Sequence, residues 1–290
     1  MTSPLQILTL SLTVALSAYF GPIILSLLAP HIQSLLPSSG DGYQCPPHSY
    51  TTTIISLDPL LIYIHNFVSS IESSSLVTLG TPLLEPSPVT GYGSDAKGSQ
   101  ARTSWSAPLP SDNEFVSCIL ARAESFMGNL LLAGRDEIGQ AQLVRYTEGQ
   151  KFDLHHDWFS RPRLLDDDAE TGRRRLYNRV ATIFLTLEAK NVTEGTGETW
   201  FPFAKRVWAD GTKKGAGGEE ADEKEKYWRE HEDGGLAFKA IPGNALFWVN
   251  LFPGNGSGDG RTLHAGLPVK GNGVKTAMNI WPRVFFGPDA

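Results

Sequence analysis

The chain has 290 residues, of which 41% are hydrophobic, and a formal net charge of −6. All-β domains often reach roughly 200–250 residues, so a single core with flanking segments can account for this length. Because phosphate binding requires a basic surface, the acidic charge argues against nucleic acid as the main partner.

The amino-terminal part of the chain is apolar. Residues 1–40 contain no Asp, Glu, Lys or Arg. Residues 7–29, interrupted by Pro22, are long enough to cross a bilayer core of about 30 Å as a helix. A cleaved signal peptide would have a basic n-region and a clean small-residue cleavage site, which this stretch lacks. Against a buried helix, the stretch is terminal and apolar nearly all round. We therefore expect an uncleaved signal anchor in residues 1–33; its orientation stays open, because the first basic residue is Lys97.

Two features bear on the cellular compartment. The triplets that begin at Asn191 and Asn255 fit the acceptor pattern for N-glycosylation, which indicates entry into the secretory pathway. Cys45 and Cys118 either form one disulfide or remain two buried thiols. We favour the thiols.

After the apolar run, the sequence divides into a linker and a folded domain. Residues 34–50 are rich in Pro, Ser and Gly and are expected to form the linker; residues 51–290 are expected to form the domain. Apolar runs between Gly and Pro turns predict strands at residues 51–55, 60–64, 143–146, 179–187, 245–251 and 275–281. Such a series predicts a mainly β fold with flanking helices (α+β), as a double-sheet jelly roll or barrel.

Helices and charged insertions complete the domain. A helix start is expected at Ser69, and apolar residues at helical spacing predict a helix within residues 113–132. Residues 164–175 and 209–235 are charged insertions. The second has no apolar periodicity, so we expect a solvated, flexible loop there.

The stretch at residues 146–157 carries the chemistry. His155 and Asp157 are two residues apart, so on an extended strand their side chains leave the same face. His264 is the candidate for a third ligand, because two His and one carboxylate on a β scaffold form the facial triad of non-haem Fe(II) oxygenases. His156 should point to the opposite face, as a structural or substrate-side residue. A His-x-Asp pair alone is a weak signal.

A larger set of motifs resembles the prolyl 4-hydroxylase group of 2-oxoglutarate/Fe(II)-dependent dioxygenases. The central motif is Tyr-x-x-Gly-Gln-x-aromatic-x-x-His-x-Asp, from Tyr146 to Asp157. The resemblance covers residues 61–283, and the order and spacing of its motifs agree. The others are Tyr63-Ile-His-Asn-Phe67, Arg102-Thr-Ser104, Arg179-Val-Ala-Thr182, Gly197-Glu-Thr199, Gly243-Asn-Ala-Leu-Phe-Trp248, His264-Ala-Gly-Leu-Pro-Val269 and Lys275 to Trp281.

The resemblance implies a double-stranded β-helix (jelly-roll) core and a set of cofactors. His155, Asp157 and His264 would hold Fe(II), which leaves positions for 2-oxoglutarate and O₂. It also implies ascorbate as a further small molecule. Zn²⁺ is an alternative metal for the same ligands, in a hydrolase. That alternative leaves Lys275 without a partner and lacks a conspicuous general base.

Further roles come from the resemblance. Lys275 would bind the far carboxylate of 2-oxoglutarate, since a buried Lys requires an anionic partner; a surface Lys is the alternative. Tyr146 would hydrogen-bond the cosubstrate and Trp281 would line the same pocket, unless each is an ordinary core residue. Arg179 would lie on the substrate side, or else pair with the acidic residues 166–168.

Other positions belong to the scaffold or depart from the family pattern. Thr199 we expect to be scaffold. Phe152, on the substrate side, is usually a Tyr in the group, which bears on substrate identity. Leu154 replaces a common Pro, and the loop around residues 271–273 is one residue longer than expected. These last two departures leave metal and cosubstrate binding as expected.

The implied activity is hydroxylation of a C–H bond, with release of succinate and CO₂. The resemblance points to a prolyl residue of a peptide or protein as the acceptor. An alternative acceptor is another side chain or a small molecule. An alternative to an enzyme is a catalytically inactive jelly-roll binding module. We expect a single-pass protein of the endoplasmic reticulum membrane with a lumenal catalytic domain.

Overall fold

The computed structural model describes residues 43–88, 101–165, 168, 172–206 and 226–287. The predicted anchor and residues 34–42 of the predicted linker lie outside this part of the chain. Cys45–Ala290 form one compact unit, which begins before the expected domain start at Thr51. Within the described residues, no helix is both long and apolar enough to cross a membrane.

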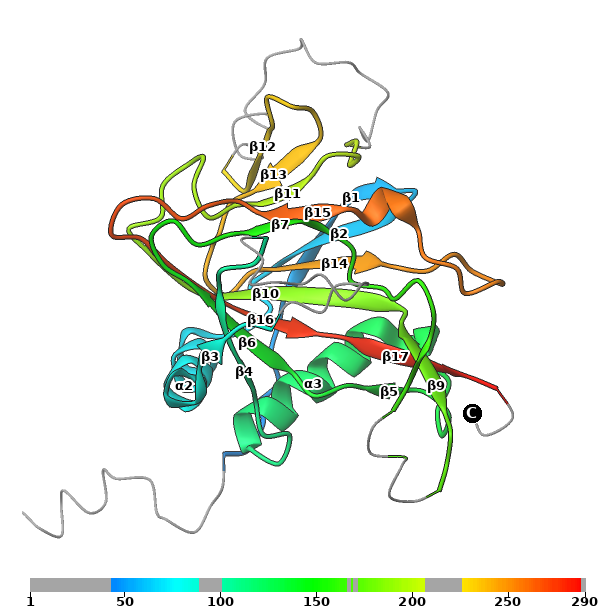
Figure 1. Cartoon of the computed structure of the whole chain (residues 1–290). Helices are drawn as coiled ribbons and strands as arrows, with labels where there is room; N and C mark the ends of the chain where they lie inside the picture. The colour runs from blue at the N-terminus through cyan, green and yellow to red at the C-terminus, as the bar shows by residue number, and fades with distance from the viewer. Residues whose placement is uncertain (1–42, 89–100, 166–167, 169–171, 207–225, 288–290) are drawn as a thin grey trace, which may run out of the picture. The chain divides into compact units, whose positions relative to one another are not determined.

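The strands of the described residues form three antiparallel sheets (Figure 1). The largest has the order β1 (Thr51–Leu57), β2 (Leu60–His65), β14 (Ala245–Val249), β10 (Ala181–Lys190), β16 (Val274–Ile280), β6 (Gln142–Tyr146), β4 (Trp105–Pro108) and β3 (Glu85–Pro86). The second has the order β12 (Trp228–Glu230), β13 (Leu236–Phe238), β11 (Thr199–Phe201), β15 (His264–Gly266) and β7 (Phe152–His155). The third has the order β5 (Glu137–Ile138), β17 (Pro282–Phe286), β9 (Leu176–Arg179) and β8 (Arg163–Leu164).

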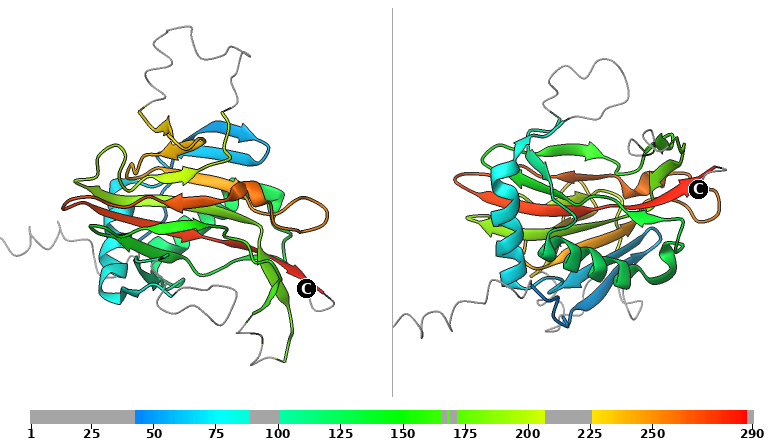
Figure 2. Two further views of the ribbon diagram at one scale, coloured as in Figure 1. Left: turned by 45° about the horizontal axis from the view of Figure 1, so that its top comes forward. Right: turned by 90° about the horizontal axis from the view of Figure 1, so that it is seen from below.

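The two larger sheets pack face to face, with the helices on the outer face of the larger one (Figures 1 and 2). Side chains of both sheets meet in one buried aromatic cluster, which includes Tyr63 and Trp248 from one sheet and Phe201 and Phe238 from the other. This is the double-sheet arrangement of a jelly roll. The predicted mainly β fold with a jelly-roll core is therefore confirmed.

The central strand β10 shows why its sequence is almost continuously apolar. Side chains alternate between the two faces of a strand, and both faces of β10 are covered. Ile183 and Leu185 belong to the cluster on the helical side, whereas Phe184 belongs to the cluster between the sheets. A strand buried on both faces is apolar at nearly every buried position, and the exceptions in β10 are the threonines Thr182 and Thr186.

In the part of the chain that the structure describes, two helices cover the outer face of the large sheet, and both begin at polar caps. In α2 (Ser70–Gly80), Ser69 and Glu72 form a reciprocal capping box. In α3 (Glu114–Met127), the side chain of Asn113 accepts hydrogen bonds from the backbone N–H groups of Phe115 and Val116. Both predicted helices are present. Short 3₁₀ turns are η1 (Thr81–Leu83), η2 (Gly128–Leu130) and η3 (Gly260–Thr262).

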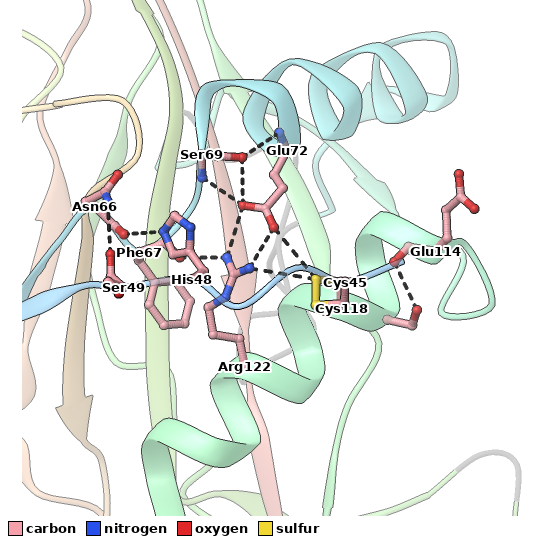
Figure 3. A network of polar contacts seen from close by, with 11 residues as sticks. Cys45, His48, Ser49, Asn66, Phe67, Ser69, Glu72, Glu114, Cys118 and Arg122 are labelled. Carbon is pink, nitrogen blue, oxygen red and sulfur yellow. Dashed lines mark hydrogen bonds and ion pairs between the residues drawn. A yellow bond between two sulfur atoms is a disulfide. The ribbon is translucent and has the colours of Figure 1, made fainter. Parts of the chain in front are cut away.

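A buried ion pair joins the two helices beside a disulfide (Figure 3). Arg122 of α3 donates to Glu72 of α2 at 2.7 Å, and the Glu72 side chain is 0% exposed. Cys45 and Cys118 form a disulfide with their Cα atoms 5.3 Å apart. The expectation of two thiols is therefore wrong. No local sequence pattern indicates this pairing, because the two cysteines are 73 residues apart and the packing of α3 brings them together.

The second charged insertion is partly structured. Residues 226–235 include β12, where Trp228 is buried and Arg229 pairs with Glu198 at 2.7 Å. The expectation of a flexible loop is wrong for these residues. Residues 209–225 of the insertion lie outside the described part of the chain.

Candidate active site

Two paired strands of the second sheet bring the predicted triad together. In the register of β7 and β15, His155 lies opposite His264, and Asp157 follows just after β7. Each imidazole Nε2 is 3.8 Å from an oxygen of the Asp157 carboxylate. One ligand atom from each of the three residues lies within 4.8 Å of the others. His156 is outside this group and donates from its Nε2 to the carbonyl of Gly260 at 3.1 Å.

Backbone carbonyls fix the orientation of both imidazoles. The Nδ1 of His155 donates to the carbonyl of Asp153 at 2.8 Å, and that of His264 donates to the carbonyl of Thr262 at 2.9 Å. With the proton on Nδ1, the lone pair of each Nε2 is free to bind a metal.

A hydrogen-bond chain holds the carboxylate. Asp157 Oδ2 accepts from the hydroxyl of Thr182 at 2.8 Å and from the indole N–H of Trp281 at 3.2 Å. Thr182 in turn accepts from the side-chain amide of Asn250 at 2.9 Å. The roles of Thr182 and Asn250 were not predicted. The Arg179-Val-Ala-Thr182 motif was the only signal for the first.

The site has the charges that a divalent metal requires. Burial lowers the pKa of His155 and of His264, so both imidazoles are neutral at neutral pH. Burial by itself raises the pKa of Asp157, but the imidazoles, Arg179 and the Thr182 hydroxyl outweigh it and hold that pKa below its usual range. The carboxylate is therefore ionised. Two neutral imidazoles and a carboxylate can bind a metal without releasing a proton.

A buried lysine faces the site from the large sheet. Lys275 is 2% exposed and its Nζ donates to the hydroxyl of Thr199 at 3.2 Å. Among the described residues, no carboxylate lies within ion-pair distance of this Nζ. Burial lowers the pKa of Lys275 to about 7, although Glu198 opposes the shift. Such a cation fits an anionic ligand. Thr199, which we expected to be scaffold, is its hydrogen-bond partner.

The other predicted residues meet in one cavity of about 510 Å³. The register of β16 and β6 sets Tyr146 beside Lys275, and burial raises the pKa of this tyrosine, which stays a neutral hydrogen-bonding group. The Phe152 ring stacks on the His155 ring with 3.5 Å between centroids. The triad, Tyr146, Phe152, Arg179 and Trp281 all line the cavity.

Arg179 lines the cavity, and the one described residue of the acidic run pairs with another arginine. Its guanidinium donates to the carbonyl of Asp157 at 3.2 Å and lies 3.6 Å from the ring centroid of Trp281. Asp168 pairs instead with Arg175 at 2.8 Å. Residues 166 and 167, the rest of the acidic run, lie outside the described residues.

Comparison with known proteins agrees with this site. Residues 141–283 match the 2OG-Fe(II) oxygenase superfamily. The chain is 30% identical to prolyl 4-hydroxylase 13 of Arabidopsis thaliana, over 79% of this chain and 73% of the relative. It is 28% identical to prolyl 4-hydroxylase 2 of the same plant, over 79% and 69%. The viral collagen prolyl hydroxylase of Paramecium bursaria Chlorella virus-1, solved with 2-oxoglutarate, shares the fold at a TM-score of 0.51, with 23% identity over 77% of this chain and 96% of that one.

The fold and the donor set define a 2-oxoglutarate- and Fe(II)-dependent dioxygenase. More specifically, the chain belongs to the prolyl 4-hydroxylase family of these enzymes. Its residues fit both groups that the family requires: the triad offers two nitrogens and one carboxylate to the metal, and the buried Lys275 offers a cation to 2-oxoglutarate.

Proposed function

We propose that this dioxygenase hydroxylates prolyl residues of a peptide or protein at the 4-position. The observation that carries the proposal is one cavity that is lined by the triad and by Thr199, the hydrogen-bond partner of Lys275. The same cavity has an aromatic wall, which includes Phe152 and Trp281. Apolar rings suit the face of a prolyl ring. The names of the plant relatives support the choice of acceptor.

In the proposed reaction, iron, O₂ and 2-oxoglutarate supply the oxidation, which yields succinate, CO₂ and the hydroxylated acceptor. The protein provides position and charge. The triad would hold the metal, and Thr182 and Trp281 keep the carboxylate of Asp157 in place. Lys275 would bind the far carboxylate of 2-oxoglutarate.

The remaining cavity residues would place the acceptor. Tyr146 would contribute a hydrogen bond to the cosubstrate. Arg179 lies over Trp281 on the wall beside the triad, where a substrate would rest. Phe152 and Trp281 would exclude water from the reacting carbon.

The test is an assay of the purified full chain with Fe(II), 2-oxoglutarate, ascorbate and proline-rich peptides. Succinate release and a hydroxyproline residue in the peptide, identified by mass spectrometry, are expected. His264→Ala should abolish both, whereas the matched control His231→Ala, outside the cavity, should retain them. Succinate release without hydroxyproline in any peptide would contradict the prolyl acceptor.

We also propose that the protein is a single-pass protein of the endoplasmic reticulum membrane with a lumenal catalytic domain. The Cys45–Cys118 disulfide supports an oxidising compartment. The acceptor Asn191 and Asn255 side chains are exposed, as glycosylation requires. A mobility shift on endoglycosidase treatment and retention of the full chain in carbonate-washed membranes are expected; a chain that is unglycosylated and washed free would contradict this location.

Ascorbate is proposed as the reductant that keeps the iron divalent. With Fe(II) and 2-oxoglutarate, activity should decline over successive turnovers when ascorbate is omitted and recover when it is restored. Equal time courses with and without ascorbate would contradict this role.

A further inference from the structure

We propose that the substrate carries a carboxylate near the hydroxylated residue, and that Arg163 and Arg179 bind it. This inference rests on the proposed function, because it names the class of peptide that the same cavity accepts: an acidic one, with an Asp or Glu side chain close to the target proline.

The wall of the cavity has an excess of positive charge. Apart from the metal ligand Asp157, its permanently charged side chains are Arg102, Arg163, Arg179 and Asp153. Asp153 is already paired, with Lys151 at 2.6 Å. The whole chain has a net charge of −6, so this basic wall is a local feature against an acidic background.

Two of these guanidinium groups share one aromatic ring. Arg163, on β8, lies 4.0 Å from the ring centroid of Phe159, and Arg179 lies 4.9 Å from the same centroid. Two like charges that contact the same ring repel each other, and an anion between or beside them would offset that repulsion.

Arg163 is available to a ligand. Its guanidinium makes the ring contact, and no carboxylate of the described residues pairs with it. The other arginines nearby are engaged: Arg102 donates to Ser104 and Gln142, and Arg175 pairs with Asp168. A planar guanidinium that is stacked on a ring presents its N–H groups sideways, in the geometry that a carboxylate accepts.

The charge at this wall can be tested with peptide pairs. Peptides blocked at both ends carry one proline and one Glu, within about three residues on either side, and each has a partner with Gln in place of Glu. For the best Glu position, kcat/KM should be about tenfold higher than for the Gln partner, the order of one charge-assisted hydrogen bond.

Substitution of Arg163 identifies the residue responsible. Arg163→Gln should reduce the Glu preference to less than about twofold, mainly through KM, because the change removes a substrate contact. Arg161→Gln is the matched control: it removes the same charge two residues away, from an exposed side chain outside the cavity wall. It should keep the tenfold preference.

Two results would overturn the inference: equal kcat/KM for the Glu and Gln peptides at every position, or a preference that survives Arg163→Gln. Comparison of amidated peptides with free acids separates a side-chain carboxylate from a terminal one; a preference seen only with free acids contradicts the Asp or Glu assignment. If no peptide is hydroxylated, the prolyl proposal fails separately. Fluorescence anisotropy of the labelled peptides with Zn²⁺-loaded enzyme then still measures the charge preference.

Discussion

At the scale of single residues, the candidate site contains a buried lysine that no carboxylate of the described residues neutralises. A buried cation costs free energy unless an anion accompanies it, and within the described part of the chain Lys275 has only the hydroxyl of Thr199 within hydrogen-bond distance. Under the proposed function, the binding of 2-oxoglutarate to Lys275 would offset this cost. The affinity for 2-oxoglutarate should then follow the protonation of this one side chain.

This predicts a pH dependence. Because burial lowers the pKa of Lys275 to about 7, the lysine is charged below pH 7 and progressively neutral above it. The KM for 2-oxoglutarate should be flat below pH 7 and rise toward about tenfold per pH unit above it, since a neutral amine does not attract the carboxylate. Steady-state kinetics measure this. Lys275→Met should have a high KM at every pH. A native KM that is constant from pH 7 to 9 would contradict the lowered pKa, and an unchanged KM in Lys275→Met would contradict the role.

A second prediction concerns the hydroxyl behind the metal ligand. Thr182→Val preserves the shape of the side chain but removes the 2.8 Å hydrogen bond to Asp157. Metal affinity should fall by about 10–100-fold, the usual effect of losing a partner of a metal ligand. Isothermal titration with Fe(II) under anaerobic conditions measures it. Thr186→Val, a buried threonine on the same strand outside the cavity wall, is the control. Equal Fe(II) affinity in Thr182→Val and Thr186→Val would show that the hydrogen bond to Asp157 does not contribute to metal binding.

At the scale of elements, periodicity and caps predicted the two described helices and six of the eight described strands of the largest sheet, but missed most of the short strands of the other two sheets. Motif spacing predicted the triad. His155 and Asp157 could be paired from their spacing, and His264 from the family motif. Contacts to this site from residues on other strands could not be predicted from spacing or motifs. Thr182 reaches Asp157 only because β10 passes behind the end of β7, and Arg163 reaches Phe159 only through the small third sheet. Such contacts depend on packing, which no local pattern encodes.

The two outer helices are joined by a buried ion pair whose loss should be costly. Arg122→Met leaves the buried carboxylate of Glu72 without its cation, and the free energy of unfolding should fall by about 3–5 kcal/mol. Chemical denaturation measures this. Lys190→Met is the control, because the Lys190 side chain is 67% exposed in its pair with Glu188 and should contribute less than about 1 kcal/mol. A similar loss in both variants would contradict the importance of burial.

The same pair predicts acid sensitivity. Burial raises the pKa of Glu72, but hydrogen bonds from Arg122 and Ser69 outweigh it and lower the pKa to about 2, from an ordinary value of 4.5. A carboxyl whose pKa is depressed on folding stabilises the protein above its unfolded pKa. That stability is lost as the pH falls from about 4.5 to about 2. The loss of unfolding free energy between these pH values should be smaller in Arg122→Met than in the native protein, as chemical denaturation at each pH would measure. Equal losses in both proteins would contradict the ion pair as the source of the acid sensitivity.

At the scale of the whole molecule, the disulfide closes a long loop and ties the first residues of the compact unit to α3. For a sequence separation of 73, chain entropy gives a stabilisation of at most about 4 kcal/mol. A Cys45→Ser/Cys118→Ser variant should lose about 2–4 kcal/mol of unfolding free energy. A reductant should destabilise the native protein by a similar amount but leave the double variant unchanged. No effect of reductant on the native protein would contradict a structural disulfide.

The most direct test of the account is an anaerobic titration of metal-free protein with Fe(II) and 2-oxoglutarate, followed by visible absorption. The weak metal-to-ligand charge-transfer band of the ternary complex should appear in the native protein and in His231→Ala. It should be absent in His264→Ala and require far more 2-oxoglutarate in Lys275→Ala. A band that persists in His264→Ala, or that never forms in the folded native protein, would contradict the assignment of this cavity as the iron and 2-oxoglutarate site.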